Sequence, residues 1–196
     1  IQGEARKIRY ELLSNFCLKN NIRSLITAHN LEDQVETFLI RLSRGSGLRG
    51  LSAMRPKSKI NSKIDLYRPL LDTKKEFLIK ISKKTFGNFI KDPSNKNKKY
   101  LRTKVRSLKK PLEKSGVEYE QIFKSIRNLS DSRDSLDDFL KKEFSKIIKK
   151  KDSEILINLK KFKKHNNEIK MAIINASIKK LKKNYYDPRA KKVINL

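Results

Sequence analysis

The 196-residue sequence has a single cysteine, two histidines, no tryptophan, six glycines and five prolines. The lone cysteine, Cys17, has no partner for an internal disulfide, and its apolar helical surroundings predict a small core residue in a reducing compartment. None of the cysteine and histidine spacings of a zinc site occurs, so the sequence predicts no metal ligands. No run of about twenty apolar residues is present, which excludes a membrane-spanning helix. We therefore expect a cytoplasmic protein.

Acidic side chains are also scarce: 21 Asp and Glu stand against 49 Lys and Arg, for a net charge of +28. A charge of this size favours a polyanionic partner such as a nucleic acid. A second explanation stays open, because Lys, Asn and Ile are abundant together, as an AT-rich genome would produce. A membrane surface is the weaker interpretation, since no strongly hydrophobic basic helix is present.

The stretch between Ser24 and Met54 combines the features around which the rest of the sequence is organised. A short apolar run at 25–28 predicts a buried strand. Polar residues follow it directly: His29, Asn30, Glu32, Asp33, Gln34 and Glu36. Apolar residues then recur at helical spacing, at Val35, Phe38, Leu39 and Leu42. We expect a helix that begins near Leu31, is capped by Asn30 with Asp33, and ends at the glycines 45 and 47.

This strand, turn and helix place polar groups at the carboxyl end of a strand, where ligands bind in open α/β sheets. The helix N-terminus adds free N–H groups and partial positive charge. Acidic residues in a first turn also simply favour a helix, and a lone histidine is often structural. The pattern alone therefore leaves a functional and a structural explanation open.

The alternation of elements in the first half predicts an α/β fold with a parallel sheet. An amphipathic helix over 3–19 precedes the strand at 25–28, and a second strand over 64–67 ends at Pro69, which cannot donate to a ladder. The intervening segment, 45–62, is predicted to be a loop rich in glycine, serine and basic residues.

A further helix is expected after residue 72, with Thr73 and Glu76 as a capping box, Phe77 and Ile81 on the buried face, and an end at Gly87. A short extended piece at 89–90 and a turn over 92–95 follow, and Tyr100 starts the next helix.

The second half is predicted to be mainly helical, with a domain boundary near residue 108. One long helix, or two joined helices, covers 119–150, and its apolar stripe at steps of three and four residues is typical of packing. The alternation over 155–159 fits a strand or a linker, and 168–183 is helical. We expect two domains, 1–107 and 108–196.

Several motifs resemble the tRNA(Ile)-lysidine synthetases, which belong to the N-type ATP-pyrophosphatase or PP-loop enzymes. They are the segments 29–37 (HNLEDQVET), 41–51 (RLSRGSGLRGL), 68–71 (RPLL), 92–95 (DPSN), 100–106 (YLRTKVR) and 185–193 (YYDPRAKKV). The resemblance implies that 1–107 is the C-terminal portion of a PP-loop catalytic domain, with an adenine nucleotide alpha hydrolase-like fold. It implies that 108–196 is a small, mainly helical linker and tRNA-binding domain.

One departure from the family is large. The Ser-Gly-Gly-x-Asp-Ser phosphate loop, which in the family precedes the segment resembling residues 1–10, is absent. We therefore expect that the sequence is a piece of a longer protein and that by itself it is inactive.

The resemblance implies an ATP- and Mg²⁺-dependent reaction that joins free L-lysine to C2 of the wobble cytidine of a tRNA(Ile) with a CAU anticodon, through an adenylated intermediate. It also implies roles for six residues. Asp33 and Glu36, three apart on one helix face, would recognise lysine, and His29 would lie beside the nucleotide or the cytidine. Arg102 and Arg106, four apart on one helix, would meet phosphate, as would Arg9 in a segment similar to the family's Ala-Arg-x-x-Arg-Tyr.

Two alternatives remain open. One is another PP-loop enzyme acting on tRNA, such as a thiolation enzyme, although enzymes that use several cysteines do not fit a sequence with Cys17 alone. The other is a basic module that binds RNA without catalysis. A homodimer is also left open.

Overall fold

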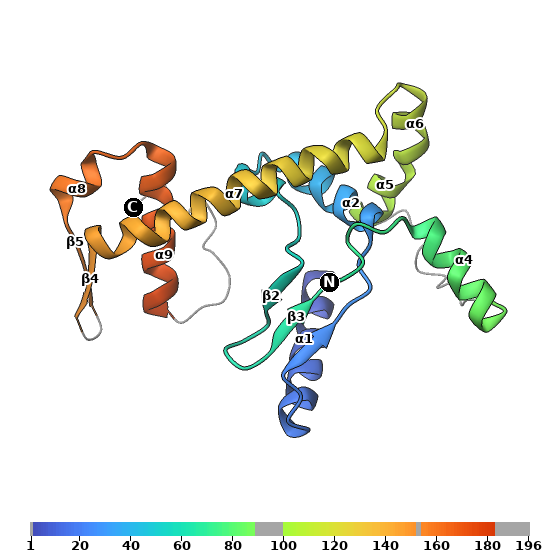
Figure 1. Ribbon diagram of the computed structural model, residues 1–196, viewed down its shortest axis with the longest axis horizontal. Coiled ribbons are helices and arrows are strands. Elements are labelled where there is room, and N and C mark those ends of the chain that lie inside the picture. Colours follow the sequence, from blue (N-terminus) through green and yellow to red (C-terminus); the bar gives the residue numbers. More distant parts are fainter. Residues whose placement is uncertain (1, 89–99, 152–153, 183–196) are drawn as a thin grey trace. The chain divides into compact units, whose positions relative to one another are not determined.

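The computed structural model of the chain describes residues 2–88, 100–151 and 154–182 (Figure 1). The chain forms two compact units, which divide between Arg133 and Asp134. No helix in the described ranges is both long enough and apolar enough to cross a bilayer.

The first unit contains a small mixed sheet in the order β1-β3-β2. Strands β1 (Ser24–Ile26) and β3 (Asp65–Tyr67) are parallel, as predicted, with Leu25 opposite Leu66. Strand β2 (Lys57–Lys59) joins β3 in antiparallel fashion. The prediction of a loop was wrong for β2, because its polar Lys-Ser-Lys sequence gives no apolar alternation by which an edge strand could be recognised.

The helices that begin in this unit are α1 (Gln2–Lys19), α2 (Leu31–Leu42), α3 (Leu48–Leu51), α4 (Lys75–Phe86), α5 (Leu101–Ser107), α6 (Lys109–Lys114) and α7 (Tyr119–Ile147). The predicted starts of α2 and α5 are confirmed. Cys17 is buried on α1, as expected for a small core residue. The short α3 lies in the segment that was predicted to be a loop.

The core of the first unit is formed where α2 meets the first half of α7. Val35 of α2 and Ile126 of α7 are almost completely buried, and Leu31, Ala53, Tyr119 and Phe123 complete the cluster. The apolar stripe of α7 therefore serves packing, as predicted. Because this packing holds the start of α7 on α2, the contacts of the first unit extend to Arg133. The domain boundary near residue 108 remains a prediction about the family's domains.

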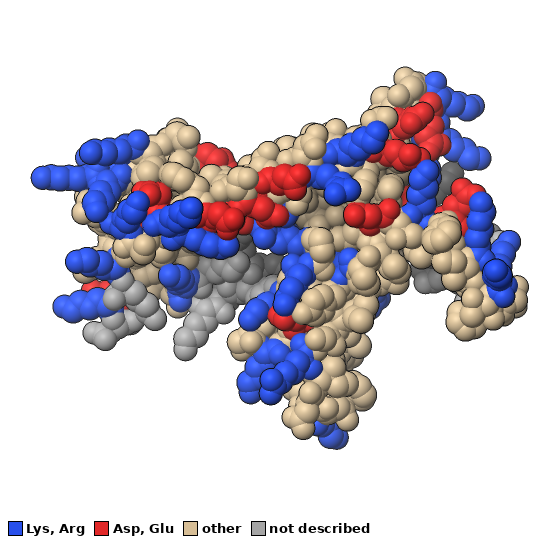
Figure 2. Space-filling view, viewed as in Figure 1, with Lys and Arg blue, Asp and Glu red and all other residues tan. Residues whose placement is uncertain are grey.

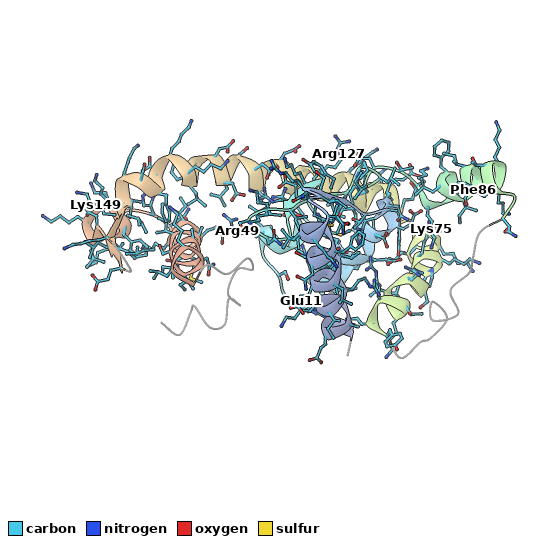
Figure 3. All side chains as sticks on the ribbon, turned by 90° about the horizontal axis from the view of Figure 1, so that it is seen from below. Glu11, Arg49, Lys75, Phe86, Arg127 and Lys149 are labelled. Carbon is cyan, nitrogen blue, oxygen red and sulfur yellow. The ribbon has the colours of Figure 1, made fainter. Side chains whose placement is uncertain are left out.

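Two expectations for α4 were wrong. The residue before the helix is Lys74, without a side-chain cap, because Thr73 lies one position earlier and its carbonyl instead accepts the N–H of Leu31 at 3.0 Å. The apolar face is not buried either: Phe77 is 58% exposed, and Phe86 projects from the end of the helix (Figure 3). The predicted end at Gly87 is confirmed, with φ of +75°. The predicted pieces at 89–90 and 92–95 lie outside the described residues.

The second unit combines the end of α7 with a hairpin and two further helices. Strands β4 (Ile148–Lys151) and β5 (Glu154–Ile157) pair antiparallel, and α8 (Leu159–Lys163) and α9 (Asn167–Lys182) follow. The buried cluster is Leu140, Ile147, Ile148, Ala172 and Ile173. The unit is mainly helical as predicted, and the alternation near 155 is a strand.

Candidate active site

The polar residues after β1 are fixed by the sheet and by the start of α2. The N–H of Thr27 donates to the carbonyl of Tyr67 at 2.9 Å, which extends the β1–β3 pairing by one residue. The hydroxyl of Thr27 is 2.9 Å from Nδ1 of His29, so the imidazole is held at the carboxyl end of the strand. His29 is therefore placed where the sequence predicted a ligand site.

Burial lowers the pKa of His29 from its ordinary 6.5, and this outweighs Asp33, which raises it. Three cations, Arg68, Arg6 and Arg102, lower this pKa further. The imidazole is consequently neutral at pH 7, and three of the four charged groups that act on it are cationic.

The depressed pKa of His29 predicts a loss of stability on acidification. The unfolded chain binds a proton at His29 near pH 6.5, whereas the folded chain does so only at lower pH, so this contribution to stability is complete above 6.5 and falls as the pH drops through the folded pKa. We expect His29→Asn to lose less stability than the wild type between pH 7.5 and 5.5 in urea denaturation. An equal loss in both proteins would contradict this.

The start of α2 is closed by a reciprocal capping box. The backbone N–H of Asp33 donates to Oδ1 of Asn30, and the N–H of Asn30 donates to Oδ2 of Asp33, both at 3.1 Å. Only one carboxylate oxygen of Asp33 is used by the cap. Its Oδ1 is turned instead to Arg102, whose Nη2 donates to it at 2.9 Å.

Glu36, one turn further along α2, is the most deeply buried acid of the site, with a side chain 2% exposed. Its Oε1 accepts from Nε of Arg106 at 2.7 Å, and its Oε2 accepts from Nε of Arg102 at 2.9 Å and from Nη2 of Arg106 at 3.2 Å. The hydrogen bond to Glu36 raises the pKa of Arg106. Asp33, Glu36, Arg102 and Arg106 are called the carboxylate–guanidinium cluster below.

The structure thus brings together four of the six predicted site residues, two from α2 and two from α5. The residues that bond to each other are 66 to 70 positions apart in the chain. His29 lies close enough for Asp33 and Arg102 to affect its pKa. Arg9 is exposed on α1, and it is Arg6 from the same helix that contributes to the field at His29. The roles assigned to these residues remain predictions.

Sequence reasoning missed a group of side chains that hold the backbone of residues 50–55. Gln34 forms two hydrogen bonds with Met54, donating to its carbonyl at 2.9 Å and accepting from its N–H at 2.8 Å. Nη1 of Arg41 donates to the carbonyls of Gly50 and Ala53, each at 2.8 Å. Arg133 donates to the hydroxyl of Ser52 at 2.9 Å. Among so many basic residues, no local signal distinguishes Arg41 and the buried Arg133 from solvated arginines.

The backbone of residues 50–55 is tightly packed. A Cβ added at Gly50 would lie 2.5 Å from Cβ of Ser46, and Ala53 has a φ of +50°. Burial lowers the pKa of Arg41, and the charges of Arg6, Arg133 and Arg68 lower it further. Several guanidinium groups are therefore close together on this side of α2, which favours an anionic ligand.

Two cavities of the first unit lie away from the side chains of the cluster. One of about 310 Å³ adjoins the N-terminus of α2 and is lined by Glu32, Lys109 and Tyr119, among others. The other, of about 570 Å³, lies against Cys17 and Arg23. Neither cavity is lined by the cluster or by His29.

Positive charge is widespread on the surface. On the face shown in Figure 2, Lys and Arg side chains cover parts of both units, and acidic side chains gather in a few patches. On the hairpin and α8, the described basic residues include Lys149, Lys151, Lys160, Lys161 and Lys163, all exposed. Such surfaces suit a phosphate backbone.

Comparison with known proteins gives two findings. A model of the PP-loop domain matches residues 1–112. Several curated relatives carry the name tRNA(Ile)-lysidine synthase. The protein from Wolbachia pipientis wMel is 36% identical over 195 residues, 99% of this chain and 45% of its own length. The protein from Zymomonas mobilis is 36% identical over 161 residues, 81% of this chain and 48% of its own length.

A third relative of that name, from Orientia tsutsugamushi, is 46% identical over 112 residues, 57% of this chain and 25% of its own length. The chain spans about half the length of the curated relatives from Wolbachia and Zymomonas. The match to the domain model covers more than half of the chain, including His29 and the whole carboxylate–guanidinium cluster. The chain therefore belongs to the PP-loop family.

Proposed function

We propose that the protein to which this chain belongs is a tRNA(Ile)-lysidine synthetase, which uses ATP and L-lysine to convert the wobble cytidine of a tRNA(Ile) with a CAU anticodon into lysidine. The names of the relatives support this proposal. The observation that carries it is the pair of carboxylates Asp33, in the first turn of α2, and Glu36, one turn further along, shortly after the strand tip.

In this proposal the carboxylates Asp33 and Glu36 recognise the cationic lysine, because both carboxylates already hold a cationic side chain, Arg102, between them. Oxygen atoms of carboxylates are suited to an ammonium because a charge-assisted hydrogen bond is roughly twice as strong as a neutral one. His29, neutral at pH 7, lies beside the nucleotide or the cytidine and can accept or donate one hydrogen bond there.

The arginines near His29 fit a polyphosphate. Arg6, Arg68 and Arg102 each lower the pKa of His29, so positive charge converges on this point. An ATP bound here would supply the adenylyl group, and these guanidinium groups would stabilise negative charge on its phosphates.

The described residues contain no cluster of acids and histidines that could hold a metal ion. We propose that Mg²⁺ arrives with the nucleotide. Arg9 and Arg106 are the further predicted phosphate contacts.

The test uses the full-length protein with ATP, L-lysine and a tRNA(Ile) transcript with a CAU anticodon. We expect release of AMP and pyrophosphate that depends on lysine, and no reaction with a transcript in which the wobble cytidine is replaced by uridine. Transfer of sulfur to tRNA would favour the thiolation alternative, and tight RNA binding without AMP release would favour the non-catalytic one. The first is not supported by the buried Cys17.

We further propose that the protein acts in the cytoplasm, where its tRNA substrate is found. The exposed lysines of the hairpin and α8 would contact the tRNA backbone without reading its sequence. Light scattering on the same preparation decides whether a homodimer forms.

A further inference from the structure

The carboxylate–guanidinium cluster is electrically balanced. Two carboxylates, Asp33 and Glu36, bond to two guanidinium groups, Arg102 and Arg106. A cationic substrate that approaches such a cluster meets no net negative charge, so its Coulomb attraction is small. A lysine ammonium can gain full charge-assisted hydrogen bonds here only if one of the two guanidinium groups leaves.

The two arginines are bound in different ways. Arg106 donates through two nitrogens to Glu36, in a fork that uses both carboxylate oxygens. Arg102 instead bridges the two acids, with one hydrogen bond to Oδ1 of Asp33 and one to Oε2 of Glu36, each at 2.9 Å. The guanidinium of Arg102 therefore occupies the position between the acids that an ammonium donating to both would take.

If Arg102 leaves this position, the buried carboxylate of Glu36 still has hydrogen-bond donors. Glu36 would keep both of its bonds to Arg106, and Asp33 would keep its bond to the N–H of Asn30. The side chain of Arg102 is 33% exposed, so it has access to solvent if it is displaced. Arg106 is similarly exposed, at 35%, but its departure would leave Glu36, 2% exposed, with a single partner.

We propose that Arg102 is an internal competitor of lysine: its guanidinium holds the place of a substrate ammonium between Asp33 and Glu36, and lysine binds by displacing it. This inference rests on the proposed function. After displacement, the three groups that remain, Asp33, Glu36 and Arg106, carry a net charge of −1. The released guanidinium of Arg102 can then pair with an anion of the substrates, either the carboxylate of lysine or a phosphate of ATP. Arg102 thus determines the affinity for lysine in addition to any contact with phosphate.

The test measures binding of L-lysine to the full-length protein by calorimetry, with a non-hydrolysable ATP analogue present. Because Arg102→Ala removes the competitor, we expect the dissociation constant for lysine to fall about fivefold, the equivalent of one ion pair that no longer has to be broken. Arg102→Lys places another cation near the acids and is expected to restore an affinity close to that of the wild type. A purely structural role for Arg102 would weaken binding instead.

Lys104→Ala is the matched control, because it removes one exposed positive charge from the same helix, α5, and should leave the affinity for lysine unchanged. A second measurement follows the Nε–H signal of Arg102 by NMR, assigned by its absence in Arg102→Ala. We expect n-butylamine, which carries only the ammonium, to shift this signal, and norleucine, which lacks the side-chain amine, to leave it in place.

An unchanged or weaker affinity in Arg102→Ala would overturn the inference, as would a signal that does not respond to n-butylamine. The proposed function fails in a different way, if the wild-type protein with its tRNA releases no AMP in response to lysine. In that case the inference falls with it.

Discussion

Replacing Glu36 by Gln is expected to lower the free energy of unfolding by about 2–3 kcal/mol, one of the two largest effects of a single substitution that we anticipate. Glu36 is 2% exposed and accepts three hydrogen bonds from two guanidinium groups. An amide keeps one acceptor but turns an NH₂ group toward donors and removes the charge that both arginines need. Because the two arginine side chains are 33% and 35% exposed and can regain water, the loss stays below that of a completely buried pair.

Urea denaturation followed by circular dichroism measures this effect. Glu76→Gln is a suitable control, because Glu76 is 75% exposed and pairs only across one helical turn, with Lys80. We expect it to change stability by no more than about 0.5 kcal/mol. If both substitutions had similar effects, Glu36 would not be the residue that holds α5 on α2.

Replacing Asp33 by Asn in the full-length protein is expected to raise the lysine concentration for half-maximal AMP release by about tenfold or more, the loss of one charge-assisted bond to the substrate. Stability should change less than in Glu36→Gln, since an amide oxygen can still accept the N–H of Asn30 in the capping box. Exchange of pyrophosphate into ATP in the absence of lysine should be nearly unaffected, because no role in adenylation is assigned to Asp33.

The matched control for this measurement is Asp131→Asn, which removes an exposed carboxylate from α7. A normal requirement for lysine in Asp33→Asn would show that this carboxylate does not bind the substrate. A requirement raised equally in both variants would point to the net charge of the protein rather than to the site.

The elements that sequence reasoning predicted well are those whose signals are local. The strand before His29, the cap at Asn30 and the helix after it depend on residues within a few positions of one another, and each is present. The predicted burial of the strand was wrong, because Ile26 is 67% exposed. The parallel pairing of β1 with β3 follows from the order of elements. The apolar periodicity of α7 likewise predicted a packed face, although its packing against α2 was not predicted.

What was missed depends on partners far apart in the chain. Asp33 and Glu36 were predicted to meet lysine, and Arg102 and Arg106 to meet phosphate, and these roles remain predictions. The sequence did not predict that the four side chains bond to each other. A sequence with 49 basic residues offers each acid many candidate partners, and only the fold selects among them. The exposure of Phe77 on α4 has the same origin, because helical periodicity shows that a face is apolar but not that it is covered.

Neighbouring side chains of α2 form two separate sets of contacts. Asp33 and Glu36 belong to the cluster with α5, while Gln34 and Arg41 hold the backbone of residues 50–55. Successive residues of a helix are rotated by about 100°. The insertion or deletion of one residue within α2 would therefore turn part of each set away from its partners, although every side chain would still be present. The number of residues between Asn30 and Arg41 is therefore constrained by two sets of contacts at once.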